Sequence, residues 1–244
     1  MKCLLMMILF FASIVANGQS ILIPGKKSFE KKWIKNNSYQ MTWYGLKDNT
    51  KFEIGTVSTQ IITSNNKLTL VTQVAIKNIN TPWVDSSVAE LKSLKPSYHS
   101  SFNMQREMAL HFGTVVTGFY NDKVKMNNTI ITDTTKSDYF DSNLYPYLIS
   151  ILPLAEGYEK EISIYDYNPS AKIGVIKAFV KQVKSGTYQS LKSGTRDVWV
   201  VTVSDEIGNG ENGISIYYFD KAERKLWKQE INAGARSMVM IVKE

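Results

Sequence analysis

The chain has almost no cysteine: Cys3 is the only one among 244 residues. Because Cys3 lies in an N-terminal apolar run, the rest of the sequence has no thiol. This absence excludes a disulfide framework, a thiolate nucleophile and a cysteine-ligated metal from the rest of the chain. A secreted animal domain of this size commonly carries disulfides, so their absence favours a bacterial envelope protein.

Histidine is also scarce, with His99 and His111 as the only two residues of this type. Neither has neighbouring donors at the spacing of metal ligands. Residues 208–213 are rich in Gly and Asn, but they lack the spacing of a calcium loop, so a hairpin loop is the better interpretation. The sequence contains no G-x-S-x-G nucleophile elbow and no phosphate-binding glycine loop. We therefore predict no catalytic residue, no metal site and no cofactor.

Long apolar runs are missing except at the N-terminus. Residues 4–15 follow Lys2 and are almost uniformly apolar, but this run is too short for a membrane-spanning helix. Ala16 and Gly18 place small residues at the two positions that a signal peptidase reads. We therefore predict a signal peptide at residues 1–18 and a mature chain without a transmembrane segment. We expect export to the periplasm or the periplasmic face of the outer membrane, with secretion as the alternative.

Basic residues exceed acidic ones. Without Lys2 the mature chain has 28 Lys and Arg against 22 Asp and Glu, a net charge of about +6. This charge can attract anionic lipid headgroups or other polyanions. However, basic and acidic residues are interspersed as on a solvated sheet face, and no basic cluster alternates with aromatic residues. The composition therefore predicts no nucleic-acid partner.

Alternation of apolar and polar residues dominates the sequence after the N-terminal region. Tyr39, Met41 and Trp43 share one face of the first such segment, as in a strand with one buried face. Similar segments, among them residues 107–120, recur between short turn sequences, which antiparallel strands allow and parallel strands do not. Gly55 interrupts the second segment and indicates a bulge or a close approach of another strand. We predict a mainly β fold with one long, strongly curved antiparallel sheet of about ten to twelve strands.

No linker or composition shift divides this β region, so we predict a single domain at residues 37–244. Residues 19–36 precede it and are interpreted as an N-terminal arm. Phe29, Trp33 and Ile34 give this arm apolar side chains that can pack on the domain.

One segment departs from the strand pattern and is typical of a helix at residues 141–152. It begins with Asp141 and Ser142, whose side-chain oxygens can cap free N–H groups, and Pro146 is tolerated in a first turn. Pro153 ends the segment. Its apolar stripe recurs at helical spacing and consists of Leu144, Tyr147, Leu148, Ile151 and Leu152. We therefore predict that the sheet is wrapped around one main central helix.

Large aromatic side chains are numerous, and we interpret most of them as core. A curved sheet around a single apolar helix can also leave an apolar cavity, because one helix rarely fills a large concave face. The predicted lining of this cavity combines the helix stripe with inward rings of the strands: Trp43, Leu144, Tyr147, Leu148, Ile151, Tyr158, Trp199 and Trp227.

Several segments resemble parts of a known bacterial family, in the same order along the chain. They are the helix region at residues 140–158, an opening strand at residues 39–45, a strand after a small turn at residues 194–201, and a closing hairpin at residues 214–221 and 224–228. On these motifs the chain resembles a bacterial envelope family of unknown function that is related to the LolA/LolB-like proteins of lipoprotein sorting. The resemblance implies an unclosed antiparallel half-barrel over a helix, with an apolar interior suited to acyl chains and no catalytic residues.

Three functional hypotheses follow. The first is a non-enzymatic envelope protein that binds a lipid or another apolar small molecule in the concave face of the half-barrel. The second is a structural or interaction module with a filled core, whose partner is another envelope protein. The third is a carbohydrate-active enzyme, which needs two carboxylates facing each other across a cleft; the candidates are Glu53, Asp85, Glu90, Asp166 and Asp197.

Overall fold

The computed structural model describes residues 21–244 apart from residues 26, 28, 49, 208–212 and 234–235. The predicted signal peptide and nearly all of the loop at residues 208–213 therefore lie outside the described residues. Lys31–Trp33 form a 3-10 turn (η1), and Tyr145–Ser150 form the helix α1. The described strands are β1 (Asn37–Lys47), β2 (Thr50–Ser64), β3 (Lys67–Ile76), β4 (Trp83–Glu90), β5 (Pro96–Phe102), β6 (Arg106–His111), β7 (Val115–Asp122), β8 (Asn127–Thr134), β9 (Phe140–Asp141), β10 (Lys160–Tyr167), β11 (Ile173–Ser190), β12 (Gly194–Asp205), β13 (Ile214–Asp220), β14 (Leu226–Ala233) and β15 (Arg236–Val242).

All these strands belong to one 15-stranded sheet, in the order β8-β7-β6-β5-β4-β3-β2-β1-β15-β14-β13-β12-β11-β10-β9. Neighbouring strands are antiparallel except β9 and β10, which run parallel. The pairing of β1 with β15 joins an N-terminal half to a C-terminal half. The order ends at β8 on one side and at β9 on the other, so the sheet is open, as predicted. Its strand pairs are mainly antiparallel, which was also predicted.

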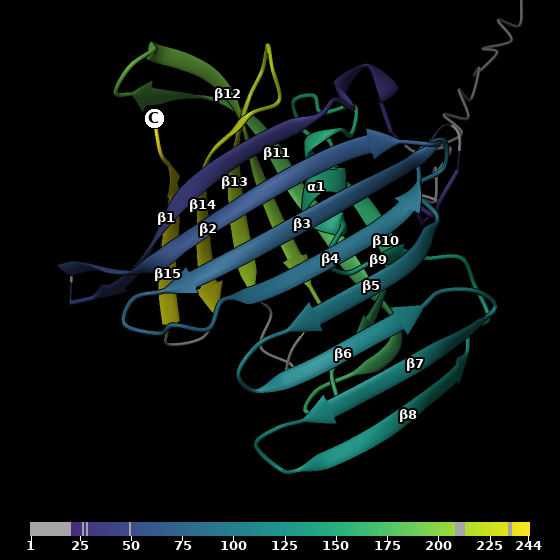
Figure 1. Ribbon diagram of the computed structural model, residues 1–244. Coiled ribbons are helices and arrows are strands. Elements are labelled where there is room, and N and C mark those ends of the chain that lie inside the picture. Colours follow the sequence, from purple (N-terminus) through teal and green to yellow (C-terminus); the bar gives the residue numbers. More distant parts are fainter. Residues whose placement is uncertain (1–20, 26, 28, 49, 208–212, 234–235) are drawn as a thin grey trace, which may run out of the picture.

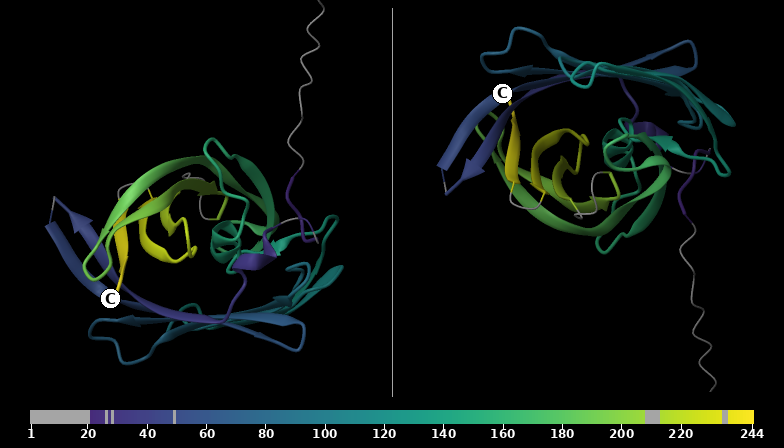
Figure 2. Two further views of the ribbon diagram at one scale, coloured as in Figure 1. Left: turned by 90° about the horizontal axis from the view of Figure 1, so that it is seen from above. Right: turned by 90° about the horizontal axis from the view of Figure 1, so that it is seen from below.

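The two halves of the sheet face each other, with α1 between them (Figure 1). The N-terminal strands form the flatter layer, whereas the C-terminal strands curl more tightly around the interior (Figure 2). The short edge strand β9 lies close to β5 of the opposite half. Among the described residues, no helix has both the length and the apolar character needed to cross a membrane.

The predicted number of strands was too low, and residues 107–120 show one reason. This segment is not a single strand, because β6 ends at His111 and β7 begins at Val115. The chain turns at Phe112, whose N–H donates to the carbonyl of Ser97 at 3.1 Å. Gly113 follows directly in that turn. A period of two continues across such a tight turn, so alternation alone did not separate the two strands.

Gly55 was expected to mark a bulge or a close approach, and the structure confirms both. The register of β1 and β2 shifts between Trp43 and Tyr44, opposite Gly55. A Cβ atom on Gly55 would lie only 2.1 Å from the carbonyl oxygen of Ala75 on β3. Glycine is therefore required here because a neighbouring backbone leaves no room for a side chain.

The predicted helix at residues 141–152 is reduced to the six residues of α1. Phe140 and Asp141 instead pair with β10 as strand β9. Asp141 and Ser142 were wrongly expected to cap the helix, because Leu144 occupies the N-cap position and makes no side-chain cap. Pro146 lies in the first turn, as predicted. The helix is therefore a short plug in the interior rather than a long central element.

The largest core cluster surrounds α1. Leu144, Leu148 and Ile149 are fully buried against inward side chains of both halves of the sheet. Each such side chain contributes about 1.5–3 kcal/mol by its burial. Phe29 of the N-terminal arm belongs to the same cluster, and Trp33 packs against it. The arm is therefore part of the folded core.

Candidate functional site

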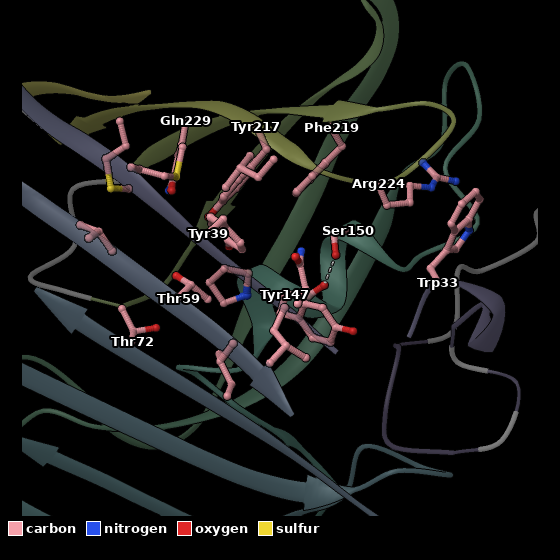
Figure 3. A pocket seen from close by; sticks show the side chains of 18 of the residues that line it. Trp33, Tyr39, Thr59, Thr72, Tyr147, Ser150, Tyr217, Phe219, Arg224 and Gln229 are labelled. Atoms are coloured by element: carbon pink, nitrogen blue, oxygen red, sulfur yellow. Dashed lines mark hydrogen bonds between the residues drawn. The ribbon is translucent and has the colours of Figure 1, made fainter. Parts of the chain in front are cut away.

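A cavity of about 210 Å³ lies beside α1, between the two halves of the sheet (Figure 3). Strands β1–β3 supply one wall and β13–β15 the other, and α1 lines the space between them. The wall residues are mostly apolar or aromatic and include Tyr39, Met41, Val57, Ile61, Leu70, Tyr217, Phe219, Leu226 and Met240. The cavity is smaller than ordinary small-molecule sites of roughly 300–1,000 Å³, so it suits a slender apolar group.

Alternation along the strands positions this lining. Side chains two residues apart point to the same face of a sheet, so Tyr39 and Met41 of β1 both face the cavity. Tyr39 is directly opposite Thr59 of β2, and Thr59 is opposite Thr72 of β3. These three side chains form one continuous row across the wall (Figure 3).

One face of the helix region completes the cavity. Asn143, Pro146, Tyr147 and Ser150 line the space, and their spacing of three to four residues places them on one side of a helix. The Ser150 hydroxyl donates to the carbonyl of Tyr147 at 2.7 Å, so it needs no partner in the cavity. Of the predicted apolar stripe, only Tyr147 therefore lies on the side that faces the cavity, and its other members belong to the core.

The Tyr147 hydroxyl is buried and has no hydrogen-bond partner among the described residues. Burial raises the pKa of Tyr147, and the nearby Tyr39 adds to this effect. Burial also raises the pKa of Tyr39, although the Thr59 hydroxyl acts in the opposite direction. Both phenols are therefore neutral at ordinary pH. An unsatisfied buried hydroxyl costs about 1–3 kcal/mol, so Tyr147 carries an unpaired donor next to the cavity.

Trp33 and Arg224 form one end of the cavity (Figure 3). Arg224 lies in the turn between β13 and β14 and stacks on Trp33, with 4.9 Å from the guanidinium carbon to the ring centroid. The exposed Lys35 and Glu223 lie at the same end. The cavity thus combines an apolar interior with a charged end.

Of the eight residues predicted to line a site, Tyr147 is the one found in this cavity. The other helix residues, Leu144, Leu148 and Ile151, belong to the fully buried core. Tyr158 and Trp199 are partly buried against that core.

Trp43 and Trp227 lie away from this lining. Trp43 is partly buried on β1, and its indole nitrogen has no partner among the described residues. Trp227 is buried in a separate cluster with Val198 and Val242. Its neighbour Leu226 lines the cavity instead, because adjacent strand residues point to opposite faces.

Sequence reasoning missed Tyr39, Trp33, Tyr217 and Arg224 as lining residues. Tyr39 had a usable signal, because period two places it on the same face as Met41 and Trp43. Arg224 had no such signal in the sequence, because the charged residues around it are typical of a surface turn.

A second, polar cluster lies where β9 meets β4 and β5. The carboxylate of Asp141 accepts a hydrogen bond from the Ser87 hydroxyl and contacts Nδ1 of His99 at 2.8 Å. The side-chain amide of Asn143 donates to the Ser87 hydroxyl at 2.8 Å. His99 is 6% exposed, and its Nε2 has no partner among the described residues. This network ties the free edge of the sheet to the opposite half.

Two carboxylates from the enzyme hypothesis, Asp85 and Asp166, line a small cavity of about 180 Å³ beside this cluster. Burial raises the pKa of Asp166, although the Ser142 hydroxyl opposes this by donating a hydrogen bond at 2.7 Å. Asp85 accepts a hydrogen bond from Trp83 at 2.7 Å. The other three candidates, Glu53, Glu90 and Asp197, do not line this cavity. In the part of the chain that the structure describes, no three His, Cys, Asp or Glu side chains converge as metal ligands.

Comparison with known proteins supports the fold and gives the family. A crystal structure of a β-barrel-like protein of the domain of unknown function DUF1849 from Brucella abortus is similar, with a TM-score of 0.51 and 10% sequence identity. The match covers 92% of this chain and 98% of the other, and at this identity it shows the fold alone. Among curated proteins, none matches this chain. The family model for a protein of unknown function, DUF3108, matches residues 38–244, and the chain therefore belongs to the DUF3108 family.

Proposed function

We propose that this chain is an exported envelope protein that binds the apolar chain of a small ligand in the cavity beside α1, without catalysing a reaction. The observation that carries the proposal is the cavity itself, which lies between both halves of the sheet and is lined mainly by apolar and aromatic side chains. The buried Tyr147 hydroxyl, which has no partner among the described residues, gives the ligand one polar contact. Export to the periplasm and a relationship to LolA/LolB-like carriers are parts of this proposal.

The energetics favour an apolar occupant. Removing apolar surface from water contributes roughly 25 cal/mol per Å², and the walls offer apolar surface on opposite sides of a narrow space. A small cavity whose exposed surface is mainly apolar does not suit a strongly hydrated molecule, because the polar groups of that molecule would lose hydrogen bonds to water. We therefore infer a single acyl or alkyl chain rather than a bulky diacyl lipid.

Filling the cavity should block binding. Thr72 of β3 is partly exposed and lines the cavity, so the substitution Thr72→Phe should place an aromatic ring in the space of the ligand. We expect the affinity for the neutral apolar probe N-phenyl-1-naphthylamine to fall at least about tenfold, which corresponds to about 1.4 kcal/mol. Titration of the purified mature chain, followed by probe fluorescence, measures this change.

The matched control is Thr69→Phe. Thr69 lies on the same strand and is also partly exposed, but it is outside the cavity lining. This variant should bind the probe like the wild-type protein. Native mass spectrometry of protein purified from a bacterial periplasm should also show an apolar adduct that is lost from Thr72→Phe. Equal probe binding by both variants, or an empty wild-type protein that binds no probe, would contradict the proposal and favour the interaction module.

A further inference from the structure

Arg224 is an unusual residue for the end of an apolar cavity, because its charged side chain is largely removed from water. It is 9% exposed. Its Nε and Nη1 atoms are buried and have no hydrogen-bond partner among the described residues. Burial lowers the pKa of Arg224, and Glu30 acts in the opposite direction. A buried cation is normally paired, so the free donors of Arg224 call for an anionic partner.

Glu30 fills this role only in part. Its Oε2 forms an ion pair with Nη2 of Arg224 at 3.6 Å, which is longer than a hydrogen bond. The same oxygen accepts a hydrogen bond from the Trp33 indole at 2.7 Å. The other carboxylate oxygen of Glu30 pairs with Lys32 at 3.1 Å. Glu30 thus divides its charge among Arg224, Trp33 and Lys32, and the buried Nε and Nη1 of Arg224 remain without a partner among the described residues.

Glu223 is also engaged elsewhere. This exposed residue lies 3.4 Å from a guanidinium nitrogen of Arg196. Lys35 is a second basic residue of the lining. The formal charges of Arg224 and Lys35 are matched by Glu30 and Glu223, so the unpaired donors of Arg224, rather than a net positive charge, favour an anion.

The turn between β13 and β14 holds Arg224 firmly in this position. The N–H of Arg224 donates to the carbonyl of Asp220 at 2.9 Å, and its φ angle is 60°. The carboxylate of Asp220 accepts the N–H groups of Ala222 and Glu223 at 2.8 and 3.0 Å. The guanidinium also stacks on Trp33. A guanidinium that is placed before the ligand arrives loses little conformational freedom on binding.

We propose that the ligand is a single-chain amphiphile with an anionic oxygen head, a carboxylate or a phosphate, and that Arg224 binds this head while the chain occupies the cavity. The inference rests on the proposed function, because it uses the same cavity. A guanidinium presents several N–H donors in a planar fork that matches both kinds of anion. Ligand orientation follows, with the head at Trp33 and Arg224 and the chain along Tyr39, Tyr147 and Tyr217.

The test compares ligands that share one chain and differ in the head. Dodecanoate, dodecyl phosphate and dodecan-1-ol are titrated against the mature chain loaded with N-phenyl-1-naphthylamine, the two anions below their critical micelle concentrations and the alcohol below its solubility limit. Wild-type protein should bind both anions roughly 10- to 100-fold more tightly than the alcohol, as expected for charge-assisted hydrogen bonds. A difference between dodecanoate and dodecyl phosphate identifies which anion the site prefers.

Two substitutions assign the preference to Arg224. Arg224→Met keeps a long stem on Trp33 but removes the charge, so it should abolish the preference for anions and leave the affinity for dodecan-1-ol within about twofold. Arg224→Lys keeps the charge and should retain part of the preference. Lys221→Met removes one charge from the same turn outside the cavity lining and should leave the preference intact.

The outcomes separate the two proposals. Equal affinity of wild-type protein for all three ligands would overturn the role of Arg224 and leave apolar-chain binding intact. The same conclusion would follow if Arg224→Met lowered the affinity for dodecan-1-ol as much as the affinity for the anions. Arg224 would then support the shape of the cavity and not bind the head of the ligand. Failure of all three ligands to displace the probe from a cavity that Thr72→Phe blocks would overturn the inference. Absence of probe binding as well would overturn the proposed function.

Discussion

Replacing Asp141 with alanine should lower the free energy of unfolding by about 3–5 kcal/mol, the range for breaking a buried charged pair. Asp141 is 1% exposed and accepts hydrogen bonds from the Ser87 hydroxyl and from the N–H of Asn143. It also contacts Nδ1 of His99 at 2.8 Å. Its loss would leave Ser87 and His99 buried without this partner. The measurement is urea unfolding followed by tryptophan fluorescence.

The control for this prediction is Asp138→Ala, a neighbouring exposed carboxylate. Asp138 forms a surface ion pair with Lys95 at 3.6 Å, and such pairs contribute at most about 1 kcal/mol. Its variant should unfold almost like the wild-type protein. Were Asp141→Ala to cost less than about 1 kcal/mol, the network would not hold β9 against the opposite half of the sheet.

The same pair should make stability depend on pH. Burial lowers the pKa of His99, but the charge and hydrogen bond of Asp141 outweigh burial, so the pKa of His99 is raised above its ordinary value of 6.5. Asp85 also raises this pKa, while Arg106 lowers it. The contribution of the protonated pair is therefore fully present below pH 6.5 and is lost as the pH rises through the higher folded-state pKa.

This pH dependence can be measured directly, because His99 and His111 are the only imidazoles. NMR titration of the His111→Ala variant reports His99 alone and should give a pKa above 6.5. The extra stability of wild-type protein over Asp141→Ala should also shrink as the pH rises. A His99 pKa at or below 6.5 would contradict this account.

The second large effect is expected for Asp220→Ala, which should cost about 2–4 kcal/mol because several donors lose one buried acceptor. Asp220 is 1% exposed. One of its oxygens accepts from Arg196 at 2.9 Å and from the Trp227 indole at 3.0 Å. The other accepts the two N–H groups of the β13–β14 turn. Urea unfolding measures this loss of stability, which should appear as a lower midpoint concentration of urea.

The pKa of Asp220 makes this contribution sensitive to acid. Burial raises the pKa, but the hydrogen bonds from Arg196, Trp227 and the turn outweigh it and lower the pKa below the ordinary 3.8. The contribution is therefore present above pH 3.8 and is lost as the pH falls through the lower folded-state pKa. The exposed Asp197 provides the control, since Asp197→Ala should change stability by less than about 0.5 kcal/mol. A loss of similar size in both variants would refute the role of Asp220.

Features that depend on near neighbours in the chain could be predicted from the sequence. Alternation revealed the β class, and short turns implied antiparallel pairing. Gly55 marked the place where β2 bulges and approaches β3. Pro146 was correctly placed in the first turn of the helix. Each of these features depends on backbone geometry within a few residues, so it could be predicted from a single sequence.

The tertiary structure alone decided the length of the helix and the lining of the cavity. Asp141 looks like a helix cap in the sequence, but partners on β4 and β5, which are far away in the chain, draw it into a strand. The helix stripe looked suited to a ligand, yet both halves of the sheet bury all of it except Tyr147, which alone of the stripe lines the cavity. Arg224 reads as a surface residue until the fold places Trp33 over it. These outcomes depend on contacts between distant segments, which local periodicity does not encode.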